Sequence, residues 1–133
     1  MDASIVVNID VPELTPAIQF YEAALGAKVA RVLDDDVAEL EYGSSLLCFL
    51  MKPSGSTATP TGSRRELGRH WTPVHVDFVV DDIDAAVARA VAAGATRESE
   101  CVEWRGSKCV SFSDPFGHGF CLIEFAGDGY EIG

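Results

Sequence analysis

Two pairs of polar residues lie at alternate positions in short apolar stretches, where they could bind or activate a small molecule. His75 and Asp77 form one pair, and Asn8 and Asp10 form the other. Alternate residues of a strand share a face, so each pair would project to one side of a sheet. An imidazole titrates near neutral pH and could act as a general base or donate to a ligand oxygen. A purely structural role for His75 explains the same spacing, so both interpretations stay open.

The four cysteines are Cys48, Cys101, Cys109 and Cys121. No two of them form a C-x-x-C pair, and their spacing is not that of a zinc ribbon. We expect reduced thiols that pack as small hydrophobic groups. Cys121, and less clearly Cys48, could also line a pocket. A nucleophilic thiol would need a basic neighbour, and His75 is the candidate that the sequence offers.

A stretch rich in Gly, Ser, Thr and Pro, Pro53–Thr72, separates two apolar regions. A linker this long inside a small domain is typically functional or mobile. Its charged residues are Arg64, Arg65, Arg69 and Glu66, a net charge of +2. The arginines could bind an anion, or they could belong to a solvated loop.

The first apolar region predicts a strand, a helix and three further strands. We expect Thr15 to cap the helix, Pro16 to be its first residue and Gly26 to end it. The strands follow from apolar alternation and turn residues. They are Ile5–Val11, Lys28–Leu33, Val37–Tyr42 and Leu46–Met51.

The second region repeats this order at an offset of 69 residues, with Val7 matching Val76 and Leu14 matching Ile83. Asp82 or Asp84 would cap the second helix, and Gly94 would end it. The strands of this half are Val74–Val80, Thr96–Trp104, Lys108–Ser113 and Gly119–Phe125. The chain therefore predicts two β-α-β-β-β modules. The face bearing His75, Asp77, Asn8 and Asp10 would line a cavity or meet solvent.

The overall charge excludes several classes of partner. The 133 residues carry 10 Lys and Arg against 21 Asp and Glu, a formal net charge of −11. Nucleic acids and anionic membranes attract clustered cations, so neither is an expected partner. No apolar run reaches the length of a membrane-spanning helix. The acidic start, Met1–Ser4, does not match a signal peptide, so we expect a cytoplasmic protein.

Three motifs resemble one superfamily. VPELTPAIQFYEAALG (residues 11–26) resembles D-L-x-x-S-x-x-F-Y-x-x-x-L-G, HVDFVVDDIDAA (75–86) follows H-x-x-x-x-V-x-D-x-x-x-A, and DPFGH (114–118) matches a D-P-x-G hairpin. These are similar to signatures of the vicinal oxygen chelate superfamily, which includes glyoxalases (lactoylglutathione lyases), bleomycin resistance proteins and extradiol dioxygenases.

The resemblance implies an α+β fold in which two βαβββ modules form a curved mixed sheet, a cup with the helices on its outer face. One glyoxalase-like domain would cover residues 1–133. Module one would span 4–52, the linker 53–72, module two 73–126 and a tail 127–133. A homodimer is also implied.

The resemblance places metal ligands on the first and last strand of each module. The corresponding residues are Val6, Phe49 or its neighbour Cys48, His75 and Cys121. Only His75 is a ligand of the family's type, and a catalytic site normally needs three protein ligands. We therefore expect no metal site of the family's type, although a divalent ion with shifted ligands stays open.

The sequence predicts a protein that binds a small, partly apolar molecule. The candidate binding residues are Asn8, Asp10, Phe49, His75, Asp77, Cys121, Trp104 and Arg65. His75 is the catalytic candidate if a reaction occurs. The alternative is a lyase, isomerase or dioxygenase that depends on a divalent metal with shifted ligands, which could include His70 or His118. A third possibility is a non-catalytic interaction module that dimerises through its sheet edges.

Overall fold

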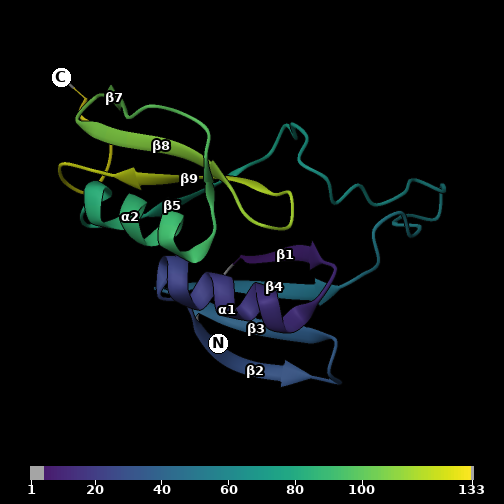
Figure 1. Ribbon diagram of the computed structural model, residues 1–133. Coiled ribbons are helices and arrows are strands. Elements are labelled where there is room, and N and C mark those ends of the chain that lie inside the picture. Colours follow the sequence, from purple (N-terminus) through teal and green to yellow (C-terminus); the bar gives the residue numbers. More distant parts are fainter. Residues whose placement is uncertain (1–4, 133) are drawn as a thin grey trace. The chain divides into compact units, whose positions relative to one another are not determined.

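The computed structural model describes residues 5–132, so the first residue of the expected module one and the last residue of the tail lie outside it. The chain divides into two compact units between Gly68 and Arg69, inside the expected linker. Each unit consists of one helix and one mixed sheet (Figure 1). This arrangement confirms the α+β class and the two βαβββ repeats.

The first unit has the order strand, helix and three strands. Its strands are β1 (Val6–Val11), β2 (Lys28–Leu33), β3 (Val37–Tyr42) and β4 (Ser45–Met51), and its helix is α1 (Leu14–Leu25). The strand order in the sheet is β1-β4-β3-β2, with β1 parallel to β4 and the other neighbours antiparallel. Helix α1 returns the chain to the end of the sheet at which β1 began, so β2 runs in the same direction as β1. Two antiparallel connections then make β4 parallel to β1 as well.

Helix α1 covers one face of this sheet and buries its apolar residues. Tyr21 and Phe49 are almost fully buried, and their ring centroids are 4.7 Å apart. Phe49 is paired with Ile9 of β1 and Ala38 of β3, so these side chains share the helix-covered face. Asn8 and Asp10 alternate with them and project to the opposite face, which we call the open face.

The expected start of α1 was wrong by two residues. The helix begins at Leu14, and Glu13, with φ −140° and ψ 136°, is its N-cap without a side-chain hydrogen bond. Thr15 therefore lies inside the first turn. Pro16 is tolerated there because the first backbone N–H groups of a helix have no intrahelical acceptor. Gly26 ends the helix with φ 69°, as expected.

The second unit repeats the topology with one more strand. Its strands are β5 (Val76–Val79), β6 (Thr96–Arg97), β7 (Val102–Trp104), β8 (Ser107–Ser113) and β9 (Gly119–Glu124), and its helix is α2 (Ile83–Ala93). The strand order is β5-β9-β8-β6, and β7 also pairs with β8. Strand β5 runs parallel to β9, as β1 does to β4.

The expectation of a single strand from Thr96 to Trp104 was wrong. Strands β6 and β7 both pair with β8, but the intervening residues bulge away from it. The Ser111 N–H donates to Ser99 Oγ at 2.9 Å, and the Glu98 N–H donates to the Ser111 carbonyl at 2.8 Å. At the bulge, the Ser99 hydroxyl thus accepts the hydrogen bond that a backbone carbonyl would accept in a regular pair of strands.

Two carboxylates accept hydrogen bonds from backbone N–H groups at the N-terminus of α2. Asp82 is the N-cap, and its Oδ1 accepts from the Ala85 N–H at 3.2 Å. Glu124 of β9 accepts from the Ile83 N–H at 2.9 Å, which fastens the helix to the sheet. The core beneath α2 contains Phe78 and Leu122, both buried.

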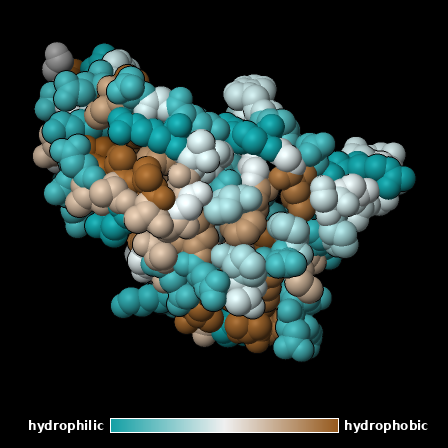
Figure 2. Space-filling model, in the orientation of Figure 1, coloured by the Kyte–Doolittle hydropathy of each residue, from teal (hydrophilic) through white to brown (hydrophobic). Residues whose placement is uncertain are grey.

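Most of the surface seen in Figure 2 is hydrophilic, with apolar residues exposed in a few places. One of these places is the lower edge of the view, where Figure 1 places β2. Val29, Val32 and Leu33 of this edge strand are each about 40–50% exposed. No helix in residues 5–132 is long and apolar enough to cross a membrane.

Candidate functional site

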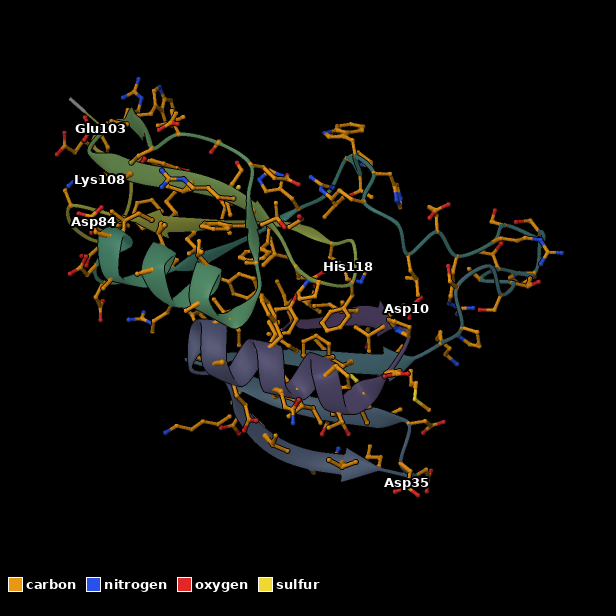
Figure 3. All side chains as sticks on the ribbon, viewed as in Figure 1. Asp10, Asp35, Asp84, Glu103, Lys108 and His118 are labelled. Atoms are coloured by element: carbon orange, nitrogen blue, oxygen red, sulfur yellow. The ribbon has the colours of Figure 1, made fainter. Side chains whose placement is uncertain are left out.

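The predicted residues of the first unit divide between the two faces of its sheet. Asn8 and Asp10 lie on the open face, and Asp10 is near the end of β1 (Figure 3). Asp10 Oδ2 accepts from Arg65 Nε at 2.8 Å. Arg65 also donates to Ser56 Oγ and to the Thr57 carbonyl, so this arginine fixes the linker to β1.

Phe49 does not lie on the open face, contrary to the expectation that it lines the ligand site. It packs in the core against α1, and its neighbour Cys48 lies opposite Asn8 instead. Strand β4 reads Leu-Leu-Cys-Phe-Leu, so apolar alternation could not tell which residues face the helix. The corresponding position of the superfamily therefore falls on Cys48, whose side chain is buried.

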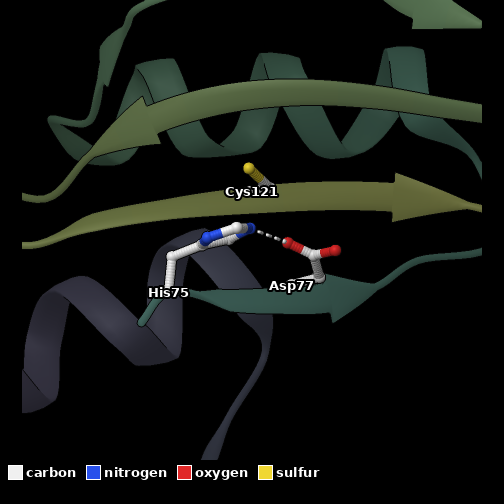
Figure 4. A group of neighbouring side chains, drawn as sticks. All are labelled: His75, Asp77 and Cys121. Carbon is white, nitrogen blue, oxygen red and sulfur yellow. Dashed lines mark ion pairs between the residues drawn. The ribbon is translucent and has the colours of Figure 1, made fainter. Parts of the chain in front are cut away.

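The open face of the second sheet brings together three residues that the sequence singled out. Asp77 of β5 pairs with Cys121 of β9, and His75 directly precedes β5 on the same face. Figure 4 shows the His75 imidazole and the Asp77 carboxylate directed toward each other, with Cys121 on the neighbouring strand. His75 Nε2 is 3.2 Å from Asp77 Oδ1, and a nitrogen, an oxygen and the Cys121 sulfur all lie within 4.8 Å of one another.

A cavity of about 200 Å³ opens beside this group, within the second unit. His75 and Cys121 line it, whereas Asp77 does not. Its other polar lining comes from Arg69, Thr72, Glu98 and Ser111. Its lining also includes Trp71 and, from β8 and β9, Phe112, Gly119 and Phe120. The rings of Phe112 and Phe120 stack on each other and alternate with Ser111 and Cys121, so they lie on the helix-covered face with Phe78. The cavity thus combines a few convergent polar groups with one aromatic side chain, that of Trp71.

An ion pair forms one wall of the cavity. Arg69 Nε and Nη2 donate to the two Glu98 carboxylate oxygens, both at 2.8 Å. The Arg69 guanidinium lowers the pKa of Glu98 through this hydrogen bond, and Glu98 in turn raises the pKa of Arg69. Gly119 makes room for the guanidinium, because a Cβ at this position would lie 2.7 Å from Arg69 Nη2.

The environment of Cys109 on the open face disfavours its thiolate. Burial, and to a lesser extent the neighbouring Cys121 thiol, raise the pKa of Cys109 to about 12. Cys121 Sγ lies 3.4 Å from Ser111 Oγ. Cys109 is therefore a neutral thiol at physiological pH.

Several other candidates lie away from the cavity. Trp104 is 58% exposed on β7 and contacts the ring of Tyr130 at 4.9 Å. His118 lies in the turn between β8 and β9 (Figure 3), where its backbone N–H donates to Asp114 Oδ1. Arg64 donates to the Gly55 carbonyl within the linker. These contacts serve local structure.

Sequence reasoning did not assign Glu98, Thr72 or Ser111 to a site. Glu98 belongs to the bulge between β6 and β7, which no pattern predicted, and Ser111 lies in a strand where a serine carries no special signal. Arg69 was considered as one of the linker arginines that could bind an anion, and Trp71, also in the linker, as an aromatic residue that could form an apolar wall. The start of the second unit at Arg69 explains why both reach its cavity.

The residues present do not fit the metal site that the superfamily resemblance implies. Val6 has no donor atom, and the position on β4 offers only a buried thiol. The second unit instead offers imidazole, carboxylate and thiol donors from His75, Asp77 and Cys121. Such a mixed N, O and S set suits zinc-like ions better than the oxygen-preferring ones.

The chain is similar to several solved structures. It shares 21% identity with the lactoylglutathione lyase of Agrobacterium tumefaciens, with 93% of this chain and 94% of that one covered and a TM-score of 0.66. It shares 17% identity with the fosfomycin resistance protein FosX of Listeria monocytogenes. This match covers 96% of this chain and 94% of that one, with a TM-score of 0.73. At these identities the likeness concerns the fold alone.

A curated relative is the anthracycline biosynthesis protein DauV of Streptomyces sp. (strain C5), 39% identical over 72 residues. The match covers 50% of this chain but only 25% of the relative. The family model for a glyoxalase-like domain matches residues 6–123. The chain therefore belongs to the glyoxalase-like domain family, within the superfamily of glyoxalases, bleomycin resistance proteins and extradiol dioxygenases.

Proposed function

We propose that this protein binds a small, partly apolar molecule in the cavity of its second repeat, without a metal ion of the superfamily's usual kind. The observation that carries the proposal is the cavity itself, in which imidazole, thiol and hydroxyl groups converge beside the indole of Trp71. Its volume of about 200 Å³ is below the range of drug-sized pockets, which suits a small ligand or one ring system of a larger one.

Each part of the cavity has a distinct role in this proposal. Trp71, which is 79% exposed, offers a broad aromatic face to the apolar part of the ligand. The His75 imidazole and the Ser111 hydroxyl offer hydrogen bonds to its polar atoms. Because Arg69 is already held by Glu98, it shapes the wall and disfavours ligands that would place a second cation there.

The exposed indole of Trp71 also suggests the first compounds to test. The curated relative is named for anthracycline biosynthesis. We therefore propose anthracyclines as first probes, in a panel with smaller aromatic acids and phenols. Native mass spectrometry of the protein as purified would add any molecule that remains bound to it.

Tryptophan fluorescence gives a direct test, because the chain has only Trp71 and Trp104. In buffer with a chelator, we expect a ligand to quench the fluorescence of the Trp104→Phe variant, whose remaining indole is Trp71. The Trp71→Phe variant should show little saturable quenching. His75→Ala should weaken binding up to about tenfold, the value of one hydrogen bond of about 0.5–1.5 kcal/mol.

Arg89→Ala is the control, since Arg89 is an exposed residue of α2 that does not line the cavity. It should bind like the wild type. The proposal fails if no compound binds saturably, if the quenching follows Trp104, or if His75→Ala binds as tightly as Arg89→Ala.

A second candidate function is a metal-dependent lyase, isomerase or dioxygenase with shifted ligands. The observation in its favour is the group of His75, Asp77 and Cys121, whose donor atoms lie within 4.8 Å of one another. A bound ion would supply Lewis-acid stabilisation of negative charge on a substrate oxygen. His70 and His118 do not belong to this group.

Cobalt titration separates the two functions. If the second candidate is right, Co²⁺ should bind stoichiometrically with a thiolate-to-cobalt absorption band that Cys121→Ser removes. Cys101→Ser, which changes an exposed thiol outside the group, should keep the band. Absence of the band in the wild type would exclude Cys121 as a ligand and favour the metal-independent proposal.

A further inference from the structure

Two thiols lie side by side on the open face of the second sheet. In the antiparallel pair β8–β9, Cys109 is opposite Ile123 and Cys121 is opposite Ser111. The cysteines are therefore diagonal neighbours with side chains on the same face. Both are partly exposed, and each thiol is a hydrogen-bond neighbour of the other.

We propose that Cys109 and Cys121 are a site of reversible oxidation, at which thiol–disulfide exchange with a small-molecule disulfide such as oxidised glutathione closes an internal disulfide. The inference does not depend on the proposed ligand binding, because it concerns only the two sulfurs and their strands. Cys48 is buried in the first unit and takes no part.

The position of the side chains suggests the order of events. Cys121 lines the cavity, where its thiol can release its proton to solvent, and a His75 nitrogen lies within 4.8 Å of its sulfur. The Cys121 thiolate attacks one sulfur of the small disulfide, whose S–S bond breaks and releases one small thiol. A mixed disulfide on Cys121 results.

Cys109 then completes the exchange. It gives up its proton, attacks the Cys121 sulfur and displaces the second small thiol. In total, two protein thiols are oxidised to one disulfide, and one small disulfide is reduced to two thiols. Since burial keeps Cys109 protonated, this second step should be the slower one at neutral pH and should accelerate with rising pH.

The strand geometry indicates that the disulfide would be easily reduced. Diagonal neighbours of an antiparallel pair have Cα atoms about 7–8 Å apart, whereas disulfides usually join Cα atoms about 4.4–6.8 Å apart. Closing the bond therefore requires β8 and β9 to shift locally. A bond under such strain has a higher reduction potential and is readily reopened.

Oxidation would also change the cavity. Cys121 Sγ contacts Ser111 Oγ of β8 at 3.4 Å, and a bond to Cys109 of the same strand would draw the sulfur away from Ser111. The cavity would lose a hydrogen-bonding thiol at its wall. The oxidation state of the pair is thus positioned to alter whatever the cavity holds.

The test uses the full chain, treated with oxidised glutathione and then analysed by intact mass and peptide mapping without reduction. For the wild type we expect a loss of two hydrogens, a peptide pair joined through Cys109 and Cys121, and full reversal by dithiothreitol. Cys109→Ser should instead retain one glutathione on Cys121. Cys101→Ser, the matched control, should form the same disulfide as the wild type.

Cys101 supplies the main competing outcome, because it is exposed and precedes Val102, the residue opposite Cys109. A map that joins Cys101 to Cys109 overturns the proposal. So does a wild type that keeps glutathione on Cys121, or one in which Cys109 and Cys121 both stay free. Since the wild-type map alone decides between these results, the proposal remains testable even if a variant fails to fold.

Discussion

Glu98 and Arg69 show how single residues shape the candidate site. Their side chains come from the bulge and the linker, and they meet at the cavity wall through two hydrogen bonds of 2.8 Å. Gly119 leaves room for this position of the guanidinium, since a Cβ there would lie 2.7 Å from Arg69 Nη2 and the arginine side chain would have to shift.

This ion pair should make stability depend on acidic pH. Arg69 holds the pKa of Glu98 below its ordinary value, so the pair stabilises the fold above about pH 4.3, the ordinary pKa of glutamate, and this contribution disappears as the pH falls through the lowered value. Because both side chains are partly exposed, we expect Arg69→Ala to cost only about 0.2–1 kcal/mol at neutral pH.

Urea unfolding of wild type and Arg69→Ala at about pH 7 and about pH 3 measures this effect, and the difference between them should shrink at the lower pH. A carboxyl titration by NMR should show a higher Glu98 pKa in the variant. Arg89→Ala is the control. An equal difference at both pH values would contradict the assignment.

Asp114 organises the turn before β9. It is 5% exposed, and its Oδ1 accepts from the backbone N–H groups of Phe116 and His118 at 2.8 and 2.9 Å. Asp114→Ala leaves both donors without this acceptor, so urea unfolding should show a loss of about 1–3 kcal/mol. Asp114→Asn keeps an acceptor oxygen and should cost less. The exposed Asp128→Ala should change stability by less than about 0.5 kcal/mol.

At the scale of elements, the two helices differ in how their N-termini are satisfied. Asp82 caps α2 with its side chain, whereas Glu13, in a similar backbone conformation, makes no such bond to α1. Glu13→Asp should therefore stabilise the protein by about 0.5–1 kcal/mol, and Asp82→Ala should destabilise it by about 0.5–2 kcal/mol. Thermal unfolding checks both variants. A Glu13→Asp variant no more stable than the wild type would show that a side-chain cap does not form.

Whether a strand and its faces could be predicted depended on how regularly its apolar and polar residues alternate. Regular alternation identified β1 and β5 and placed Asp10, His75 and Asp77 on their polar faces. Strand β4 is apolar on both faces, so alternation failed there and Phe49 was assigned to the wrong one. The bulge between β6 and β7 was missed because the Ser111 N–H donates to the Ser99 hydroxyl instead of to a backbone carbonyl. A side-chain hydrogen bond of this kind leaves no alternating pattern in the sequence.

At the scale of the whole molecule, the exposed apolar residues of β2 support the expected homodimer. Val29, Val32 and Leu33 lie on an edge strand, where unpaired backbone groups favour association with another chain. Sedimentation velocity over a range of concentrations should show a dimer. Val32→Asp should shift the equilibrium toward monomer, whereas Lys28→Ala should not. A wild type that stays monomeric at every concentration would refute the expectation.

The sequence by itself determined the α+β class, the two βαβββ repeats and the superfamily, because these depend on local alternation, capping residues and motifs within single elements. It also put His75 and Asp77 on one face, since their spacing in one strand fixes this. The tertiary structure decided the partners from distant segments: Asp10 with Arg65, Glu98 with Arg69, and Cys121 with both His75 and Cys109. Such pairs depend on strand register and on the path of the linker, and neither follows from the residues of one segment.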